Sequence, residues 1–173
     1  MPSPDPSSGA RSVLDADRRA NAHYLKSRLV LRWLRAAQSW RRRTGPLGRI
    51  GHLLVGGSYK LVTEGMLGIE LPASTEVGAG LRLRHGVGIV VNPATRIGRG
   101  VMIRQHVTLG NRRSTADCPV IEDDVEIGAG AVIIGAVTVG RGARIGPNAV
   151  VVRDVPPGAV VYSPRSEVRP AAE

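Results

Sequence analysis

Aliphatic residues recur every six positions in the C-terminal half of the chain. From residue 121 to 156 the sequence divides into six hexapeptides whose first position is always aliphatic: Ile121, Ile127, Ile133, Val139, Ile145 and Val151. The fifth position is always Ala or Val, and the second is often Gly. A period of six excludes an amphipathic helix, which needs apolar residues three and four apart, and a plain alternating strand. It predicts a parallel β-helix, in which each hexapeptide forms a short strand followed by a corner.

The repeat continues upstream with two interruptions. Three more residues keep the same phase: Ile97, Ile103 and Leu109. We therefore expect residues 111–119 to leave the solenoid as a loop. A further set is six apart but shifted in phase: Val77, Leu83 and Ile89. Because Ile89 and Ile97 are eight residues apart, we expect a two-residue bulge in the sequence VVNPAT, and between four and five three-sided coils over residues 77–161.

The region before the repeats has a helical pattern. With 100° per residue, apolar side chains of residues 18–43 fall on one side and arginines on the other, with Leu31 as the exception. We expect a basic amphipathic helix that ends at Gly45 and Pro46, and a second helix from about residue 47 to 67, weakened at the Gly56–Gly57 pair. The first residues are rich in Pro, Ser and Asp, a composition that does not favour a packed structure.

These patterns divide the chain into four parts. We expect a disordered tail (1–17), a basic amphipathic helical segment (18–68), a β-helix domain (69–165) and a C-terminal tail (166–173). The predicted fold class is mainly β, a parallel β-helix of hexapeptide repeats with a short N-terminal α-helical segment. The absence of Phe in a chain that is 42% hydrophobic fits narrow coils filled by aliphatic residues.

Charge adds a question about partners. The net charge of +10 is concentrated in residues 18–63, which contain eleven Lys and Arg and no acidic residue. Two interpretations stay open for residues 18–43: peripheral contact with an anionic membrane surface, or packing against the β-helix or a neighbouring subunit with a solvated Arg face. Nucleic acid is not an expected partner, because no recognised nucleic-acid-binding module accompanies the basic segment.

Cysteine content and hydropathy bear on location. The single cysteine, Cys118, excludes an intramolecular disulfide framework and fits a reducing compartment. The sequence contains no apolar run near the roughly 20 residues that span a bilayer. The first residues lack the apolar core of a secretory signal. We therefore expect a cytoplasmic protein, with the inner face of the membrane as a possible peripheral site.

Three stretches carry a family resemblance: LRLRHGVGIVV, then IGRGVMIRQHVTLG, and after the loop IGAGAVIIGAVTVGRGARIGPNAVVVRDVPP. Over about residues 68–165 they resemble the serine acetyltransferases among the left-handed β-helix hexapeptide acyltransferases. The resemblance implies a left-handed solenoid, a homotrimer, acetyl-CoA as the acetyl donor, and active sites in clefts between adjacent subunits.

The resemblance places His85 at the position of the catalytic histidine. A His whose pKa lies near ambient pH can accept the proton of an alcohol as it attacks a thioester, and can return it to the departing thiolate. Glu70 aligns with the acidic residue that orients this His, although the family has the shorter Asp. We expect His106 to be a wall or trimer-seam residue, and we assign no role to His23 or His52.

The resemblance also suggests binding residues. For acetyl-CoA they are Gly110, Gly128, Ala129, Arg144 and Gly146, while Pro147 lacks an N–H donor that the family usually has. Arg84, directly before His85, could attract a carboxylate of the acceptor. No metal is expected. A zinc enzyme of the γ-carbonic anhydrase type needs three convergent His, and the repeats contain only His85 and His106.

The acceptor is where the chain departs from the family. Serine acetyltransferases have Asp before the catalytic His and an Arg-His pair in the loop, whereas this chain has Arg84 and the pair Asp117 and Cys118. The sequence therefore favours an O-acetyltransferase acting on a sugar or surface-glycan precursor. The alternatives are a serine O-acetyltransferase of cysteine biosynthesis and a non-catalytic trimeric solenoid scaffold.

Overall fold

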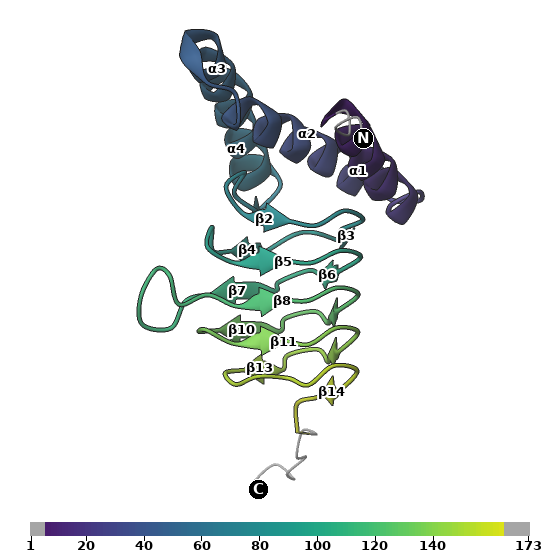
Figure 1. The fold of residues 1–173 in the computed structure, drawn as a ribbon. Helices are drawn as coiled ribbons and strands as arrows, with labels where there is room; N and C mark the ends of the chain where they lie inside the picture. Colours follow the sequence, from purple (N-terminus) through teal and green to yellow (C-terminus); the bar gives the residue numbers. More distant parts are fainter. Residues whose placement is uncertain (1–5, 165–173) are drawn as a thin grey trace, which may run out of the picture.

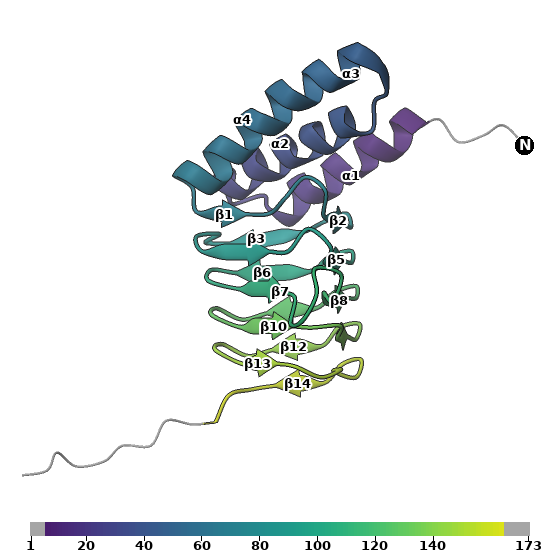
Figure 2. The ribbon, with the colours of Figure 1, turned by 90° about the vertical axis from the view of Figure 1, so that its left-hand side faces the viewer.

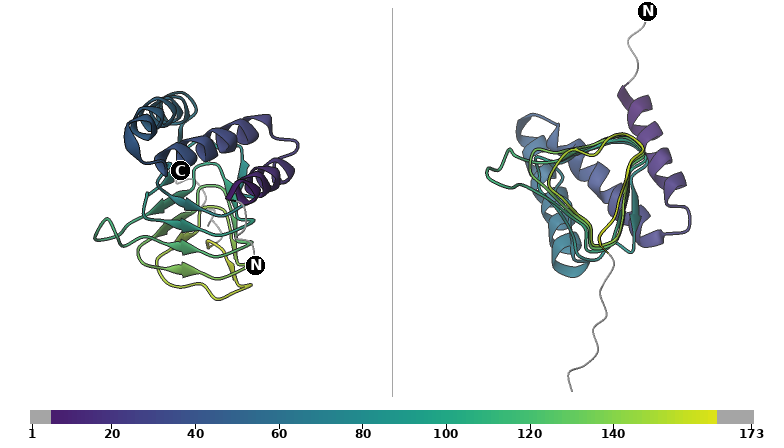
Figure 3. Two further views of the ribbon diagram at one scale, coloured as in Figure 1. Left: turned by 45° about the horizontal axis from the view of Figure 1, so that its top comes forward. Right: turned by 90° about the horizontal axis from the view of Figure 1, so that it is seen from below.

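The computed structural model describes residues 6–164 (Figure 1). Residues 1–5 of the expected disordered tail and residues 166–173 of the expected C-terminal tail lie outside this range. A block of helices (residues 6–66) covers one end of a column of stacked coils, and Figure 3 shows the column as a triangle in cross-section. The helical block is called the helical cap below.

Parallel strands stack into three sheets, one on each side of the triangle. Sheet A consists of β1 (Ile69–Glu70), β4 (Ile89–Val91), β7 (Thr108–Gly110), β10 (Val132–Ile134) and β13 (Val150–Val151). Sheet B consists of β2 (Glu76–Val77), β5 (Arg96–Ile97), β8 (Val120–Ile121) and β11 (Thr138–Val139). Sheet C consists of β3 (Arg82–Arg84), β6 (Met102–Arg104), β9 (Glu126–Ile127), β12 (Arg144–Ile145) and β14 (Val160–Val161). The fold is the predicted left-handed β-helix.

The core of the column consists of the aliphatic side chains at the repeat positions. Ile127 and Ile133, at first positions, are 0% exposed, and so is Ala131 at a fifth position. Identical positions of successive coils stack in register, for example Ile103 on Ile127. The expected loop, residues 111–119, leaves the column between β7 and β8 (Figure 1).

The two extra residues lie elsewhere than predicted. Strand pairing places Leu83 above Ile103 and Val91 above Leu109, so eight residues of the upper coil face six of the lower one. Val91 and Ile97 are six apart and both in register, so VVNPAT contains no bulge. The insertion lies between Leu83 and Val91, at residues 85–88, which we call the His85 bulge. Ile89 is buried and lies six residues after Leu83, so its spacing suggested a first position of the repeat. In the structure it occupies a fifth position, like Val107 below it, and the predicted place of the bulge was therefore wrong.

The helical cap consists of two helices and a helical rod. The helices are α1 (Pro6–Ala20) and α2 (Leu25–Arg41), and the rod combines α3 (Gly45–Gly51), the π-helical η1 (His52–Gly56), α4 (Gly57–Lys60) and the π-helical η2 (Leu61–Met66). The second predicted helix is confirmed, and the Gly56–Gly57 pair marks a change of helix type inside it. The expectation of disorder for residues 6–17 is wrong. Contacts of α1 with the first coil supply stability that local composition does not reveal.

Side chains of α1, of α2 and of the turn between them bind backbone groups of the first coil. No earlier coil pairs with β2 and β3, which are the end strands of their sheets. Backbone groups of this coil instead bind side chains of the helical cap at 2.6–3.3 Å. Asp17 accepts from Gly80 N–H, and Asn21 binds Leu81 C=O and Leu83 N–H. Ser27 donates to Leu83 C=O, and Arg35 donates to the carbonyls of Val77 and Gly78. The buried carboxylate of Asp17 also accepts a hydrogen bond from Arg35 Nε at 2.9 Å. The helical cap thus protects a sheet edge that would otherwise expose unpaired backbone groups.

Helix α2 lies between the helical rod and the first coil (Figure 2), and part of its apolar face is buried there. Val30, Leu34 and Ala37 are at most 2% exposed, and Leu31, the predicted exception, is fully buried. Packing inside the protein is therefore the arrangement of Val30, Leu34 and Ala37, whereas Leu25 and Leu29 of the same predicted face are 65% and 55% exposed. Contact of residues 18–43 with a membrane stays a prediction. Within residues 6–164, no helix is long and apolar enough to cross a bilayer.

Candidate active site

His85 begins the bulge that separates β3 from β4. Its φ is +66°, in the left-handed region that non-glycine residues rarely adopt, and Gly86 and Gly88 follow with φ of +54° and +70°. The bulge is held by hydrogen bonds from Gly88 N–H to Gly68 C=O (2.7 Å) and from His106 N–H to Val87 C=O (2.8 Å). The same corner of the lower coils also has a left-handed residue, for example His106 at φ +57°, so the run of three positive φ values is what distinguishes the bulge.

The side chain of Tyr24 lies beside the imidazole, and that of Arg84 lies over the Tyr24 ring. The ring centroid of Tyr24, in the turn between α1 and α2, is 6.4 Å from that of His85, and the two rings are perpendicular. The guanidinium carbon of Arg84 lies 4.0 Å from the Tyr24 ring centroid, and Arg84 Nη2 donates to Ala20 C=O at 3.2 Å. Arg84, the predicted acceptor-binding residue, is therefore engaged with the helical cap, and its role toward an acceptor stays a prediction.

Glu70 lies on the outer side of sheet A near the bulge. Its strand β1 pairs with β4, with Glu70 above Val90, and its side chain is exposed. Among the described residues, the structure shows no hydrogen bond between the Glu70 carboxylate and His85. The predicted pair is thus near in the fold but not joined, and its function stays a prediction.

His106 lies one coil below the His85 bulge. A Cβ added to Gly88 would overlap the His106 imidazole, so that ring packs directly against the glycine backbone. This contact fits the predicted wall position, and a place at a trimer seam stays a prediction. Within residues 6–164 no group of three or more His, Cys, Asp or Glu side chains is arranged to hold a metal ion.

Four of the five predicted acetyl-CoA residues line one groove. Gly128, Ala129, Arg144 and Gly146 enclose a cavity of about 290 Å³ together with Met102, Arg104 and neighbouring residues of sheet C. The structure does not bring Gly110 to this groove. It ends β7 on sheet A, where it pairs with Ile134 and its C=O accepts a hydrogen bond from Gly135 N–H at 3.0 Å.

The groove offers cationic and small side chains to a ligand. Arg104 and Arg144 supply guanidinium groups suited to phosphates, with Glu126 Oε2 3.9 Å from Arg144 Nε. Packing between coils already requires glycine at positions 128 and 146. A Cβ on Gly128 would lie 2.6 Å from Pro147 N, and one on Gly146 would lie 2.9 Å from Val161 O. The fit to an anionic, narrow ligand such as CoA therefore depends on Ala129 and the two arginines.

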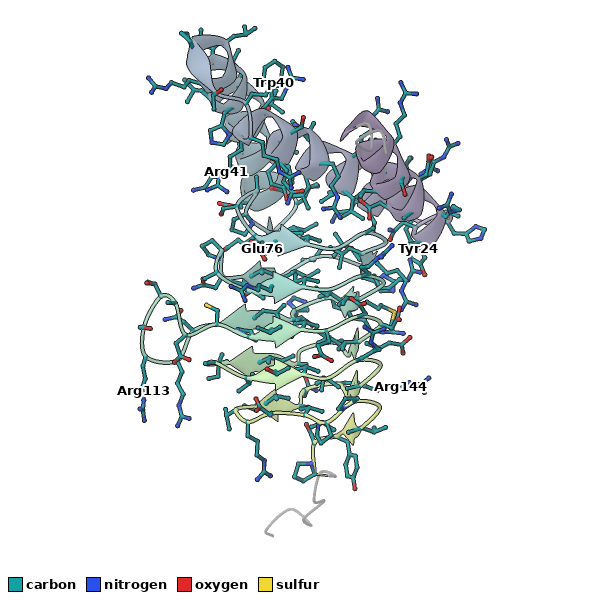
Figure 4. All side chains as sticks on the ribbon, in the orientation of Figure 1. Tyr24, Trp40, Arg41, Glu76, Arg113 and Arg144 are labelled. Atoms are coloured by element: carbon teal, nitrogen blue, oxygen red, sulfur yellow. The ribbon has the colours of Figure 1, made fainter. Side chains whose placement is uncertain are left out.

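Larger cavities occur away from this groove. One of about 730 Å³ lies between the end of α2 and the outer face of sheet B, and one of about 820 Å³ lies against the helical rod. Neither is lined by any predicted site residue. Figure 4 places Arg41 and Glu76, which line the former, away from Tyr24 and Arg144.

The loop 111–119 belongs to a different corner of the triangle. It joins sheet A to sheet B, whereas the His85 bulge joins sheet C to sheet A, and Figure 4 shows Arg113 and Arg144 on opposite sides. Inside the loop, Asp117 accepts a hydrogen bond from Arg113 N–H at 3.2 Å. Burial, and then the charge of Asp117, raises the pKa of the Cys118 thiol. Within one chain, the loop and His85 thus do not form a common site.

Sequence reasoning missed Tyr24 and Arg104. Tyr24 precedes His85 by 61 residues and carries no motif. Arg104 had a usable signal, because the repeat register places it directly below Arg84.

Comparisons with known proteins find similar sequences that contain the same hexapeptide repeats. Residues 118–153 match the bacterial transferase hexapeptide family (six repeats). A serine acetyltransferase of Bacillus licheniformis is 38% identical over 112 residues, which cover 59% of this chain and 52% of the relative. A putative colanic acid biosynthesis acetyltransferase of Escherichia coli K12 is 33% identical over 112 residues, covering 64% of this chain and 69% of the relative.

Solved structures extend the similarity to the helical cap. Soybean serine acetyltransferase without ligand has a TM-score of 0.76 and 31% identity, over 92% of this chain and 68% of that one. A serine acetyltransferase in complex with CoA has a TM-score of 0.72 and 27% identity, over 88% and 66%. The chain spans about half to 60% of the first curated serine acetyltransferases it matches, with coverage of 52% and 60%.

Proposed function

This chain belongs to the hexapeptide-repeat acetyltransferases as a serine acetyltransferase-like member, and we propose that it transfers an acetyl group from acetyl-CoA to a hydroxyl group, with His85 as general base. The observation that carries the proposal is the His85 bulge. It places an exposed imidazole on a left-handed corner of an otherwise regular coil, on the edge of sheet C whose outer face carries the groove.

The reaction needs a base at this point. His85 accepts the proton of the acceptor hydroxyl while its oxygen attacks the thioester carbonyl carbon. The new C–O bond replaces the C–S bond, and the proton returns from the imidazole to the departing thiolate. Arg104 and Arg144 would bind the phosphates of acetyl-CoA along the groove, so that the thioester is held beside the base.

L-Serine is the acceptor that the comparisons support best. The curated relatives at 38% identity are serine acetyltransferases, and so are the solved structures described above. The glycan precursor favoured by the sequence is not confirmed. It stays the second candidate for two reasons. The loop carries Asp117 and Cys118 in place of the serine-binding pair implied by the family, and a putative colanic acid biosynthesis acetyltransferase is similar over 69% of its length.

We also propose that the active unit is a homotrimer. In one chain the loop 111–119 and the His85 bulge lie at different corners of the triangle. Side-by-side packing of three columns would place the loop of one subunit next to the bulge of another. Sedimentation of the purified chain tests this arrangement, and a monomer with full activity would contradict it.

The test of the function is thiol release from acetyl-CoA. We expect release with L-serine, and the same assay with nucleotide sugars that carry free hydroxyls tests the second candidate. His85→Ala should lower kcat by about 10²- to 10⁴-fold, the usual contribution of a general base. His52→Ala, an exposed His of the helical rod, is the matched control and should leave kcat unchanged. Equal activity of wild type and His85→Ala would favour a non-catalytic scaffold.

A further inference from the structure

We propose that Tyr24 of the helical cap is a positioning residue that orients the His85 imidazole for catalysis, and that Arg84 holds Tyr24 in place. The proposal rests on the proposed function, because it concerns the same base. Its basis is a set of contacts between the α1–α2 turn and the strand that leads into the bulge.

The turn that carries Tyr24 is fixed on both sides. Before it, Asn21 Nδ2 donates to Leu81 C=O at 2.7 Å, and Asn21 Oδ1 accepts from Leu83 N–H at 3.3 Å. After it, Ser27 Oγ donates to Leu83 C=O at 2.7 Å. Asn21 and Ser27 are both buried. The two anchors bind the strand that ends one residue before His85, so the helical cap and the bulge are aligned by direct hydrogen bonds.

Arg84 fixes the Tyr24 ring itself. The guanidinium lies over the ring at 4.0 Å, and its Nη2 is tied to Ala20 C=O, at the end of α1. Its Nη1 is buried without a hydrogen-bond partner in the described chain. The electron-rich ring face is then the neighbour that stabilises this cation. Arg84 thus restricts the ring from one face and leaves it perpendicular to His85.

His85 needs such a neighbour. The His85 side chain is exposed, and no hydrogen bond from a described side chain fixes the imidazole. The perpendicular aromatic contact at 6.4 Å is the interaction that restricts its orientation. A base that rotates freely spends little time aligned with the acceptor hydroxyl, and small misplacements of catalytic groups are costly.

The contact involves the ring and not the hydroxyl group. Among described residues, the Tyr24 hydroxyl has no hydrogen-bond partner, and the contacts with His85 and Arg84 are both made by the ring. Tyr24→Phe should therefore keep the function, whereas Tyr24→Leu should lose it. Leu14→Ala is a suitable control in the same helical cap, because Leu14 is 38% exposed and Tyr24 is 37% exposed.

The experiment measures steady-state kinetics and the NMR signals of the His85 ring in these variants. We expect Tyr24→Leu to lower kcat between about tenfold and a hundredfold, with the KM for acetyl-CoA within about twofold of wild type, because Tyr24 does not line the groove. Tyr24→Phe and Leu14→Ala should match wild type. The ring-current shift of the His85 signals should persist in the Phe variant and disappear in the Leu variant.

The outcomes separate the two proposals. An unchanged kcat in Tyr24→Leu overturns the positioning role, and so does a loss of activity that Tyr24→Phe shares. If wild type releases no thiol with any acceptor, the proposed function fails. The NMR comparison then tests only whether Tyr24 contacts His85. Identical His85 signals in wild type and Tyr24→Leu overturn the contact, and a shift confined to the Leu variant supports it.

Discussion

The same corner of the triangle is built in two ways in this molecule. In the lower coils, His106, Gly130 and Asn148 make it with one left-handed residue each, at φ between +55° and +71°. In the upper coil, His85, Gly86 and Gly88 all have positive φ, and two additional residues leave the column. The strands on both sides stay in register. The difference shows that a β-helix can accept an irregular corner without disturbing its stacked core.

The two corners also differ in what surrounds them. The lower corners stack on one another, with Gly130 N–H donating to Gln105 C=O at 3.0 Å and Asn148 N–H donating to Ala129 C=O at 2.9 Å. The His85 bulge contacts the coil below through Gly88 and His106, and the helical cap above through Tyr24. We infer that the regular coils provide stability and the bulge provides chemistry, and the predictions below separate these contributions.

The largest effect on stability should come from the regular coils. Ile133 is fully buried and pairs with Leu109 and Val151 in sheet A. Ile133→Ala removes buried methyl groups and leaves a cavity, so the free energy of unfolding should fall by about 2–5 kcal/mol. Urea titration measures the loss. At temperatures where the variant is folded, its kcat should equal that of wild type, and a lower kcat would show that stability and chemistry are not separate.

A pair of glycines gives an intermediate effect. Gly142 and Gly88 have similar φ, +67° and +70°, but a Cβ on Gly142 meets nothing within 4 Å, while one on Gly88 would overlap His106. Gly142→Ala should cost about 1–2 kcal/mol from the backbone alone. Gly88→Ala should cost about 1 kcal/mol more, because the His106 ring must leave its rotamer.

The same glycine pair also tests the division of function. Only Gly88→Ala should lower kcat, since only this glycine lies in the bulge. Urea titration and thiol release on both variants provide the comparison, and equal kcat losses in the two would contradict the special status of the bulge.

The smallest effect concerns the loop 111–119, the other irregular segment. Burial and the nearby Asp117 charge raise the pKa of the Cys118 thiol, so a smaller fraction is thiolate at pH 8 than in the unfolded chain. Iodoacetamide should therefore alkylate the folded protein more slowly than the chain in urea, and the difference should shrink as the pH rises through the raised pKa. Equal rates at pH 8 would show that the loop opens freely.

The sequence predicted the features that depend on periodicity. The six-residue spacing of Ile121, Ile127 and Ile133 determines the stacking, because only one register buries all of these side chains. The exit of residues 111–119 follows from the same spacing. The assignment of His85 as the catalytic residue came from the family resemblance and stays a prediction, and the structure places this residue at a corner with positive φ.

The sequence did not predict features that depend on contacts between distant residues. Ile89 is compatible with a first or a fifth position, so periodicity alone misplaced the insertion. The helix at residues 6–17 forms against a coil 60 residues away, through Asp17 and its neighbours. The Tyr24 contact with His85 arises in the same way, and the separation of Gly110 from the groove depends on which sheet each repeat enters.

The central claim is that the two-residue insertion creates the catalytic site. Deleting Gly86 and Val87 would restore the six-residue spacing between Leu83 and the residue now numbered Val91, while keeping His85 in the chain. We predict a folded column with an unchanged circular dichroism spectrum and a melting temperature at or above that of wild type, and no detectable release of thiol from acetyl-CoA. Acetyl transfer at the wild-type rate by this deletion variant would contradict the claim.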